Sequence, residues 1–167
     1  MISIAKTGSG KTCGYLLPSI QNYINENPNY SQPNRSGAVP GRGYGAGGRY
    51  GGRGGYGRGV GNQPASTPFL LVLAPTRELA CQILVETQKF CRDLYLRAVC
   101  CYGGSPKGPQ IGAIERGVDC IIATPGRLND LLEMRKVTLS NIKFVVLDEA
   151  DRMLGKRRFL FFHMTYV

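Results

Sequence analysis

The alternation of short apolar runs with helix-like segments is the feature that most constrains how this 167-residue chain can fold. Four apolar runs are typical of buried strands, at residues 69–74 (FLLVLA), 97–101 (RAVCC), 118–123 (VDCIIA) and 142–147 (IKFVVL). Helical spacing is found at 77–90 and at 125–134, where Pro125 suits a first helical turn. Strands that alternate with helices predict an α/β domain with a mainly parallel sheet flanked by helices. Ligands of such sheets bind at the carboxyl ends of the strands, so the residues after each run are candidates for function.

The octapeptide AKTGSGKT at residues 5–12 matches the phosphate-binding loop G-x-x-x-x-G-K-[ST], with alanine in place of the first glycine. We expect residues 1–4 to end a strand and Lys11 to open a helix whose N-terminus attracts anions. In that geometry Lys11 reaches the β- and γ-phosphates, and the Thr12 hydroxyl binds Mg²⁺. The residues expected to bind the phosphates are Thr7, Gly8, Ser9, Gly10, Lys11 and Thr12. The alternative is an ordinary glycine turn before a helix.

The last apolar run leads into an acidic cluster, in the sequence FVVLDEAD. A strand-end aspartate beside a phosphate loop, here Asp148, can hold Mg²⁺, and the neighbouring Glu149 can position and deprotonate an attacking water. The alternative is an acidic helix start that the helix dipole favours. Because both motifs occur in order, the sequence predicts Mg²⁺-dependent nucleotide hydrolysis, with Lys11, Asp148 and Glu149 as catalytic residues.

Residues 27–68 differ sharply in composition from the rest of the chain. At 41–59 glycine is interleaved with arginine and tyrosine, and no acidic residue occurs. Such a segment cannot bury enough apolar surface to offset its ordering entropy, which predicts a long disordered Gly/Arg/Tyr-rich insert. Arginine pairs with phosphate and tyrosine stacks on bases, which favours weak, sequence-tolerant contact with single-stranded RNA. A loop without a partner, or self-association through tyrosine and arginine, are the alternatives.

The formal net charge of +10 favours an acidic partner, with nucleic acid first and an anionic membrane surface second. No apolar stretch reaches the roughly 18–20 residues of a membrane span, and we expect a cytoplasmic or nuclear location. The six cysteines form no C-x-x-C pair and His163 is the only histidine, which argues against a zinc site. We expect the cysteines to be small buried hydrophobic residues in a reducing compartment.

Five motifs follow one another along the chain: AKTGSGKT (5–12), APTRELA (74–80), YGG (102–104), ATPGR (123–127) and LDEAD (147–151). Their order resembles that of DEAD-box ATP-dependent RNA helicases. The resemblance implies a RecA-like P-loop NTPase domain that binds and hydrolyses ATP with Mg²⁺ while it remodels short RNA duplexes. It also implies that Asp151 links the nucleotide site to a second RecA-like domain. The residues expected along the RNA backbone are Pro75, Thr76, Arg77, Gly103, Gly104, Thr124, Gly126 and Arg127.

Elementary chemistry makes this second set plausible. Glycines let backbone N–H groups approach phosphates closely, Arg77 and Arg127 supply fixed charge, and the helix after Pro125 offers its N-terminus. Contacts to the RNA backbone carry no sequence information, so the domain should bind RNA with little sequence preference. The YGG motif alone is equally typical of an ordinary turn.

The motifs divide the chain into four parts. Residues 1–26 start the RecA-like domain, 27–68 form the insert, 69–154 complete the domain, and 155–167 are an atypical tail. The family's adenine-recognising segment, Ser-Ala-Thr motif and second domain do not occur in these 167 residues, so we expect a domain truncated at both ends. In the family, the second domain carries arginines that stabilise the transferring phosphoryl group, and such arginines are worth on the order of 10³–10⁵ in rate. The chain alone should therefore hydrolyse ATP feebly and separate no duplex. The alternatives are a short product that binds ATP or RNA without turnover, and a phosphate-loop ATPase that acts on something other than RNA.

Overall fold

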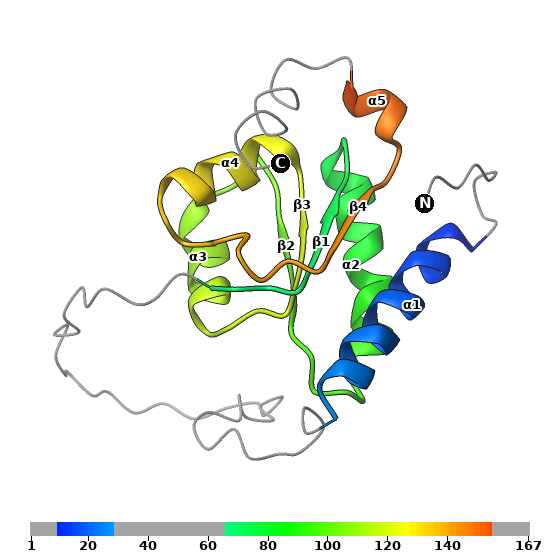
Figure 1. Cartoon of the computed structure of the whole chain (residues 1–167). Coiled ribbons are helices and arrows are strands. Elements are labelled where there is room, and N and C mark those ends of the chain that lie inside the picture. The colour runs from blue at the N-terminus through cyan, green and yellow to red at the C-terminus, as the bar shows by residue number, and fades with distance from the viewer. Residues whose placement is uncertain (1–9, 29–65, 155–167) are drawn as a thin grey trace, which may run out of the picture.

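The computed structural model describes residues 10–28 and 66–154 of the chain (Figure 1). Four parallel strands form one sheet in the spatial order β2-β3-β1-β4. The strands are β1 (Leu70–Leu73), β2 (Ala98–Cys101), β3 (Cys120–Ala123) and β4 (Phe144–Leu147). Each strand lies within one of the four apolar runs, which confirms the prediction of an α/β domain with a parallel sheet.

Helices provide the crossovers that parallel strands require. They are α1 (Lys11–Glu26), α2 (Arg77–Cys91), α3 (Lys107–Glu115), α4 (Pro125–Glu133) and the short α5 (Ala150–Leu154). Helices α1 and α2 cover one face of the sheet, and α3 and α4 cover the other (Figure 1). In the two described ranges, no helix is both long enough and apolar enough to cross a membrane.

The alternation of side chains along the strands divides the core into two layers. In β1, Leu70 and Val72 pack towards α1 and α2, whereas Leu71 and Leu73 pack towards α3 and α4. All four side chains are fully buried, as expected for an interior strand of a sheet that is covered on both faces. Strand β4 differs, because it pairs only with β1 among the described residues and its Val145 is 55% exposed.

The chain segments on either side of residues 29–65 meet in the packed domain. The Tyr23 ring of α1 stacks on Phe69, with ring centroids 3.7 Å apart. Ser66 exchanges backbone hydrogen bonds with the 136–138 segment, and Pro68 is buried. The predictions for Thr7, Gly8 and Ser9, for the insert between 29 and 65 and for the tail from 155 lie outside the described residues.

Candidate functional site

The described residues that the sequence singled out lie together at one edge of the sheet. Parallel strands bring their carboxyl ends to the same edge, and the loops that leave those ends carry the motifs. After β1 come Pro75, Thr76 and Arg77; after β2, Gly103 and Gly104; after β3, Thr124, Gly126 and Arg127; after β4, Asp148 and Glu149. Helix α1 begins at the same edge, as the hydrogen bond between its Tyr15 and Asp148 shows.

Tyr15 connects the start of α1 to the end of β4. Its hydroxyl donates a hydrogen bond to Asp148 Oδ2 at 3.1 Å, across 133 residues of sequence. Burial, together with the charge of Asp148, raises the pKa of Tyr15 above its ordinary value, so this hydroxyl keeps its proton and remains a donor. Tyr15 thus ties Asp148 to the start of α1, where Thr12, the other residue expected to bind Mg²⁺, also lies.

The start of α1 is suited to an anion. Gly10 occupies the N-cap position with φ of 78°, a left-handed conformation that glycine adopts without steric cost. No side chain caps the first turn, and the turn contains no acidic residue. Uncapped N–H groups at a helix start attract phosphates, and Lys11 adds its charge at the same turn.

The donor set beside α1 also suits Mg²⁺. This ion prefers oxygen ligands, keeps several waters, and commonly rests on one or two carboxylates together with substrate phosphates. The Thr12 hydroxyl and the Asp148 carboxylate supply oxygens of this kind. The described ranges contain no group of three or more His, Cys, Asp or Glu side chains arranged to hold a metal, so the phosphates would complete the ligand set.

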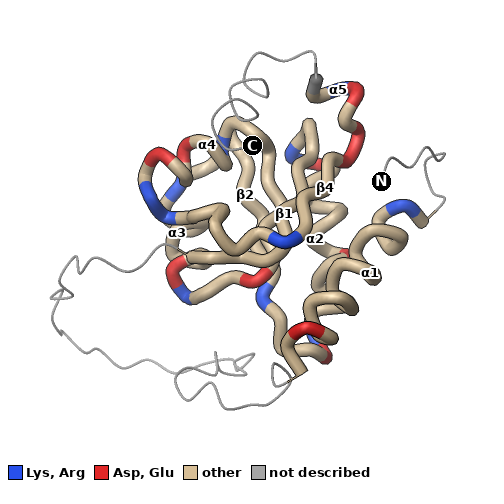
Figure 2. Tube along the Cα trace, viewed as in Figure 1, with Lys and Arg blue, Asp and Glu red and all other residues tan. Residues whose placement is uncertain are grey.

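Glu149 lies at the junction between β4 and α5 in an unusual conformation. Its φ is 51°, and left-handed backbone costs a residue other than glycine roughly 1–2 kcal/mol. Such strain is found preferentially at functional sites. The Glu149 carboxylate accepts a 2.6 Å hydrogen bond from the exposed Arg152 guanidinium. Asp151 is exposed on α5, and Figure 2 shows acidic residues along the trace where β4 ends and α5 begins.

The loops after β1, β2 and β3 touch one another. The Arg77 guanidinium lies 4.6 Å from the centre of the Tyr102 ring, in a cation–π contact. The Gly103 N–H donates to the Thr124 hydroxyl at 3.4 Å. Thr76 caps α2, since its hydroxyl accepts from the Leu79 N–H at 3.3 Å. The three loops that carry the residues expected along the RNA backbone are thus in contact with one another.

The Arg127 side chain takes a different position from the one its motif suggested. It is only 5% exposed, and it donates to Gln110 Oε1 at 2.9 Å and to the Ser105 carbonyl at 2.8 Å. Gln110 in turn bonds both backbone groups of Tyr102, at 3.2 and 3.3 Å. Arg127 and Gln110 therefore hold the 102–105 loop from inside the protein. Gln110 and Tyr15 were not expected from the sequence, because only the folded contacts reveal their partners.

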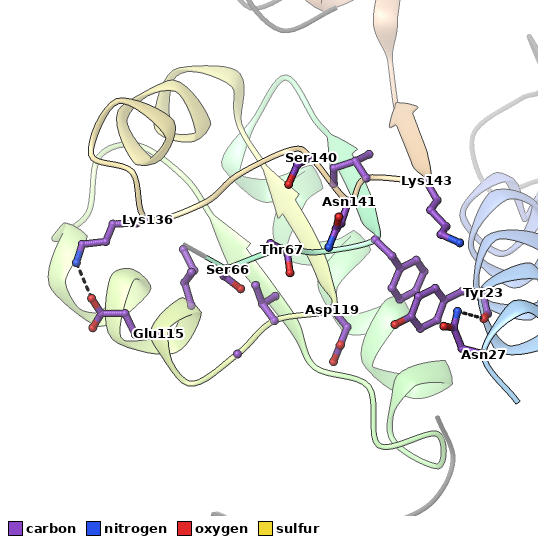
Figure 3. A pocket seen from close by; sticks show the side chains of 15 residues that line it. Tyr23, Asn27, Ser66, Thr67, Glu115, Asp119, Lys136, Ser140, Asn141 and Lys143 are labelled. Atoms are coloured by element: carbon purple, nitrogen blue, oxygen red, sulfur yellow. Dashed lines mark hydrogen bonds and ion pairs between the residues drawn. The ribbon is translucent and has the colours of Figure 1, made fainter. Parts of the chain in front are cut away.

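A cavity of about 740 Å³ opens at the opposite edge of the sheet (Figure 3). Segments that precede strands β1, β3 and β4 line it, at residues 66–69, 117–119 and 140–143. None of the motif residues is among its lining side chains. Since ligands of parallel sheets bind at the carboxyl ends of the strands, this cavity is separate from the candidate site.

Comparison with known proteins places the motifs in a family. Residues 1–163 match the family described as DEAD/DEAH box helicase. DEAD-box ATP-dependent RNA helicase 40 of Oryza sativa subsp. japonica is 46% identical over 154 residues, and ATP-dependent RNA helicase DBP2 of Candida albicans is 47% identical over 154 residues. Each match covers 92% of this chain but only 15% and 22% of the respective relative, so the chain spans less than a quarter of their length.

Two solved structures share the fold. The RNA helicase Prp28 from Chaetomium thermophilum bound to ADP superposes with a TM-score of 0.63 at 34% identity, over 93% of this chain and 30% of that one. The yeast DEAD-box splicing factor Prp28 gives a TM-score of 0.69 at 29% identity, over 98% of this chain and 31% of that one.

Proposed function

The chain belongs to the DEAD/DEAH box helicase family, and we propose that it binds ATP with Mg²⁺ and couples ATP hydrolysis to RNA binding and local duplex remodelling. The observation that carries this proposal is the hydrogen bond from Tyr15 to Asp148, because it joins the phosphate-loop helix to the acidic strand end. The two motifs with complementary chemistry thereby meet at the edge where parallel sheets bind ligands. In this proposal the domain is the first RecA-like unit of a P-loop NTPase.

The residues of the proposed nucleotide site have the following roles. Bound Mg–ATP supplies a γ-phosphoryl group for transfer to water. The phosphates bind to Thr7, Gly8, Ser9 and Gly10 and to the start of α1, where Lys11 supplies charge. Thr12 and Asp148 would hold Mg²⁺, and the Tyr15 hydroxyl positions the Asp148 carboxylate beside the start of α1.

Glu149 orients the attacking water and accepts its proton at a carboxylate oxygen. For this, the Glu149 carboxylate has to release Arg152. An exposed ion pair of this kind contributes only about 0–1 kcal/mol, so the exchange of Arg152 for water has a low cost.

The RNA site uses the joined loops at 75–77, 102–104 and 124–127. Gly103 and Gly104 are exposed and offer backbone N–H groups to phosphates, and Arg77 is exposed beside them. The Arg127 guanidinium supports this surface from below through Ser105 and Gln110. Because the contacts are to backbone, the domain selects RNA by shape and charge rather than by sequence.

The second RecA-like domain is the expected partner of Asp151. Arginines contributed in trans accelerate phosphoryl transfer by on the order of 10³–10⁵ in related systems. The curated relatives are more than four times as long as the matched region, which leaves room for such a domain in them. We therefore expect slow ATP turnover and no duplex separation from this chain alone.

The test measures nucleotide binding and ATP turnover separately. Turnover is compared with and without single-stranded RNA for the unaltered chain, Lys11→Ala and Glu149→Gln, with Lys89→Ala and Glu86→Gln as controls from an exposed ion pair on α2. Lys11→Ala should lose binding of a fluorescent ATP analogue, whereas Glu149→Gln should keep binding and lose about 10²-fold or more in turnover. Equal rates in all five proteins would refute the catalytic assignment. Binding without any turnover, with RNA present, would favour the non-catalytic ATP- and RNA-binding protein.

A further inference from the structure

Four of the six cysteines lie in two pairs between α2 and the sheet. Burial and the charge of Cys81 on α2 raise the pKa of the Cys100 thiol on β2, which indicates that the two sulfurs are neighbours. Cys120 on β3 and Cys91, the last residue of α2, likewise shift each other's pKa, and both lie in the core layer under α1 and α2. The pairs differ in access, because Cys81 and Cys100 are both partly exposed whereas Cys91 and Cys120 are 1% and 0% exposed.

An independent contact fixes the alignment of Cys81 with Cys100. Arg77 and Cys81 are four residues apart and so share one face of α2, and Cys100 and Tyr102 are two residues apart and share one side of the β2 segment. The Arg77 guanidinium lies over the Tyr102 ring at 4.6 Å, so these two faces are opposed. From Arg77 to Cys81 the helix advances by one turn, about 5.4 Å, and from Tyr102 to Cys100 the strand advances by two residues, about 6.6 Å. These distances are similar, so Cys81 lies opposite Cys100 just as Arg77 lies opposite Tyr102.

We propose that Cys81 and Cys100 are a redox modification site, at which hydrogen peroxide closes an intramolecular disulfide that thiol reductants open again. A thiolate attacks one peroxide oxygen, which gives a sulfenic acid and releases hydroxide. The second thiol then attacks the sulfenic sulfur, and its oxygen leaves as water. In total the two thiols lose two electrons and two protons, and the peroxide is reduced to two waters.

The two thiols have different roles in this reaction. Burial, with a further contribution from Cys81, raises the pKa of the Cys100 thiol to about 12. Cys100 therefore keeps its proton at neutral pH, and Cys81 is the thiol that reacts first with peroxide, since the thiolate is the nucleophile. Cys100 then resolves the sulfenic acid on Cys81. The Cys91–Cys120 pair is closed to solvent and serves as an internal control.

The bridge would join the first two turns of α2 to the end of β2. Arg77 and Tyr102 flank it at the loop surface, so it would prevent the 75–77 and 102–104 loops from separating. Any effect on RNA binding rests on the proposed function, whereas formation of the bridge does not. The experiment below contains no RNA, so failure of the RNA assignment and failure of the bridge are distinguishable.

The test treats the reduced full chain with hydrogen peroxide, unfolds it, and counts the thiols that can still be alkylated. We expect the count to fall from six to four and to return to six after dithiothreitol. Mass spectrometry of tryptic peptides should then find the 78–89 peptide joined to the 98–107 peptide, with a mass lower by two hydrogens. A non-reducing gel should show a monomer.

Three variants identify the sulfurs. Cys81→Ser and Cys100→Ser should each abolish the joined peptides, whereas Cys101→Ser, the neighbouring buried cysteine, should retain them. The proposal is overturned if the joined peptides persist in Cys100→Ser, or if the 78–89 peptide carries sulfinic acid with no partner. Bridges only between chains, or closure of Cys91 with Cys120 in the folded protein, would also overturn it.

Discussion

Three polar side chains that point into the protein hold the loops of the candidate site. Tyr15 bonds Asp148, Gln110 bonds the backbone of Tyr102, and Arg127 bonds Gln110 and the Ser105 carbonyl. Buried polar groups have to find partners, and here those partners belong to the loops that carry the motifs. The loops that carry the motif residues are therefore fastened to the packed domain.

Replacing Tyr15 by phenylalanine removes one hydroxyl and keeps the ring. A hydrogen bond to a charged group contributes about 1.5–3 kcal/mol, so we expect RNA-stimulated ATP turnover to fall by roughly tenfold or more and to need more Mg²⁺. Steady-state turnover over a Mg²⁺ titration measures both effects. The control is Tyr95→Phe, at an exposed turn. If Tyr15→Phe and Tyr95→Phe give the same Mg²⁺ dependence, Tyr15 does not position Asp148.

Replacing Arg127 by alanine takes the guanidinium donor from the Ser105 carbonyl and leaves Gln110 Oε1 with only the Tyr102 N–H. Each unsatisfied buried group costs about 1–3 kcal/mol, so the free energy of unfolding should fall by at least that amount. The exposed Arg92→Ala should stay within about 0.5 kcal/mol of the unaltered chain. Urea denaturation followed by circular dichroism gives both values. A negligible change for Arg127→Ala would mean that its charge, and not its packing, explains its place in the motif.

The helices and strands with a clear hydrophobic periodicity were predictable from the sequence. All four strands lie inside the predicted apolar runs, and α2 and α4 begin at the predicted residues. Helix α3 was not predicted, because its sequence KGPQIGAIE contains two glycines and a proline and has no clear apolar stripe. It forms where Ile114 is fully buried against the sheet and Gln110 fastens it to the 102–105 loop.

The residues of the candidate site that belong to sequence motifs were predictable. The sequence placed Asp148, Glu149 and the three loop motifs after strands, and the parallel sheet then brings them to one edge. Tyr15 and Gln110 could not be predicted, since an ordinary helical tyrosine and glutamine acquire their roles only through distant partners. The buried position of Arg127 was hidden for the same reason, because its motif alone suggests exposed charge.

The strands contribute unequally to stability, and paired substitutions can show this. Ile121 on β3 is fully buried, and Ile121→Ala should lower the free energy of unfolding by about 2–5 kcal/mol. Val145 on the edge strand β4 is 55% exposed, and Val145→Ala should cost about 1 kcal/mol or less. Chemical denaturation of both variants measures the difference. Equal losses would mean that β4 is buried in solution by something that pairs with it.

In the whole molecule, charge is distributed unevenly along the chain. Every acidic residue lies within 10–28 or 66–154, where lysine and arginine barely outnumber aspartate and glutamate. Residues of both signs are mixed along this part of the chain (Figure 2). The net charge of +10 therefore comes almost entirely from the residues outside these ranges, including the arginines between 35 and 58.

This distribution predicts where the salt dependence of RNA binding arises. Changing Arg42, Arg49, Arg53 and Arg58 to glutamine should weaken binding to single-stranded RNA. The slope of log affinity against log salt should also fall, by about 0.7 for each phosphate that the protein no longer neutralises. A control changes Lys89, Arg92, Arg116 and Arg135 to glutamine, which removes equal charge from the packed domain. Fluorescence anisotropy from low to high salt gives both slopes. Equal reductions would show that the insert has no special part in binding.

The one-sided pairing of β4 has a dynamic consequence for the acidic residues at its end. Backbone amides on the outer side of this strand have no neighbouring strand in the described part of the chain, so they should exchange with deuterium sooner than those of β1 and β3. Asp148 and Glu149 thus follow a strand that should fray sooner than β1 and β3, and Asp148 is secured by the Tyr15 hydroxyl and by its backbone hydrogen bond to β1. A segment that paired with the outer edge of β4 would slow this fraying. It would thereby lengthen the time for which the Asp148 and Glu149 carboxylates stay beside the start of α1.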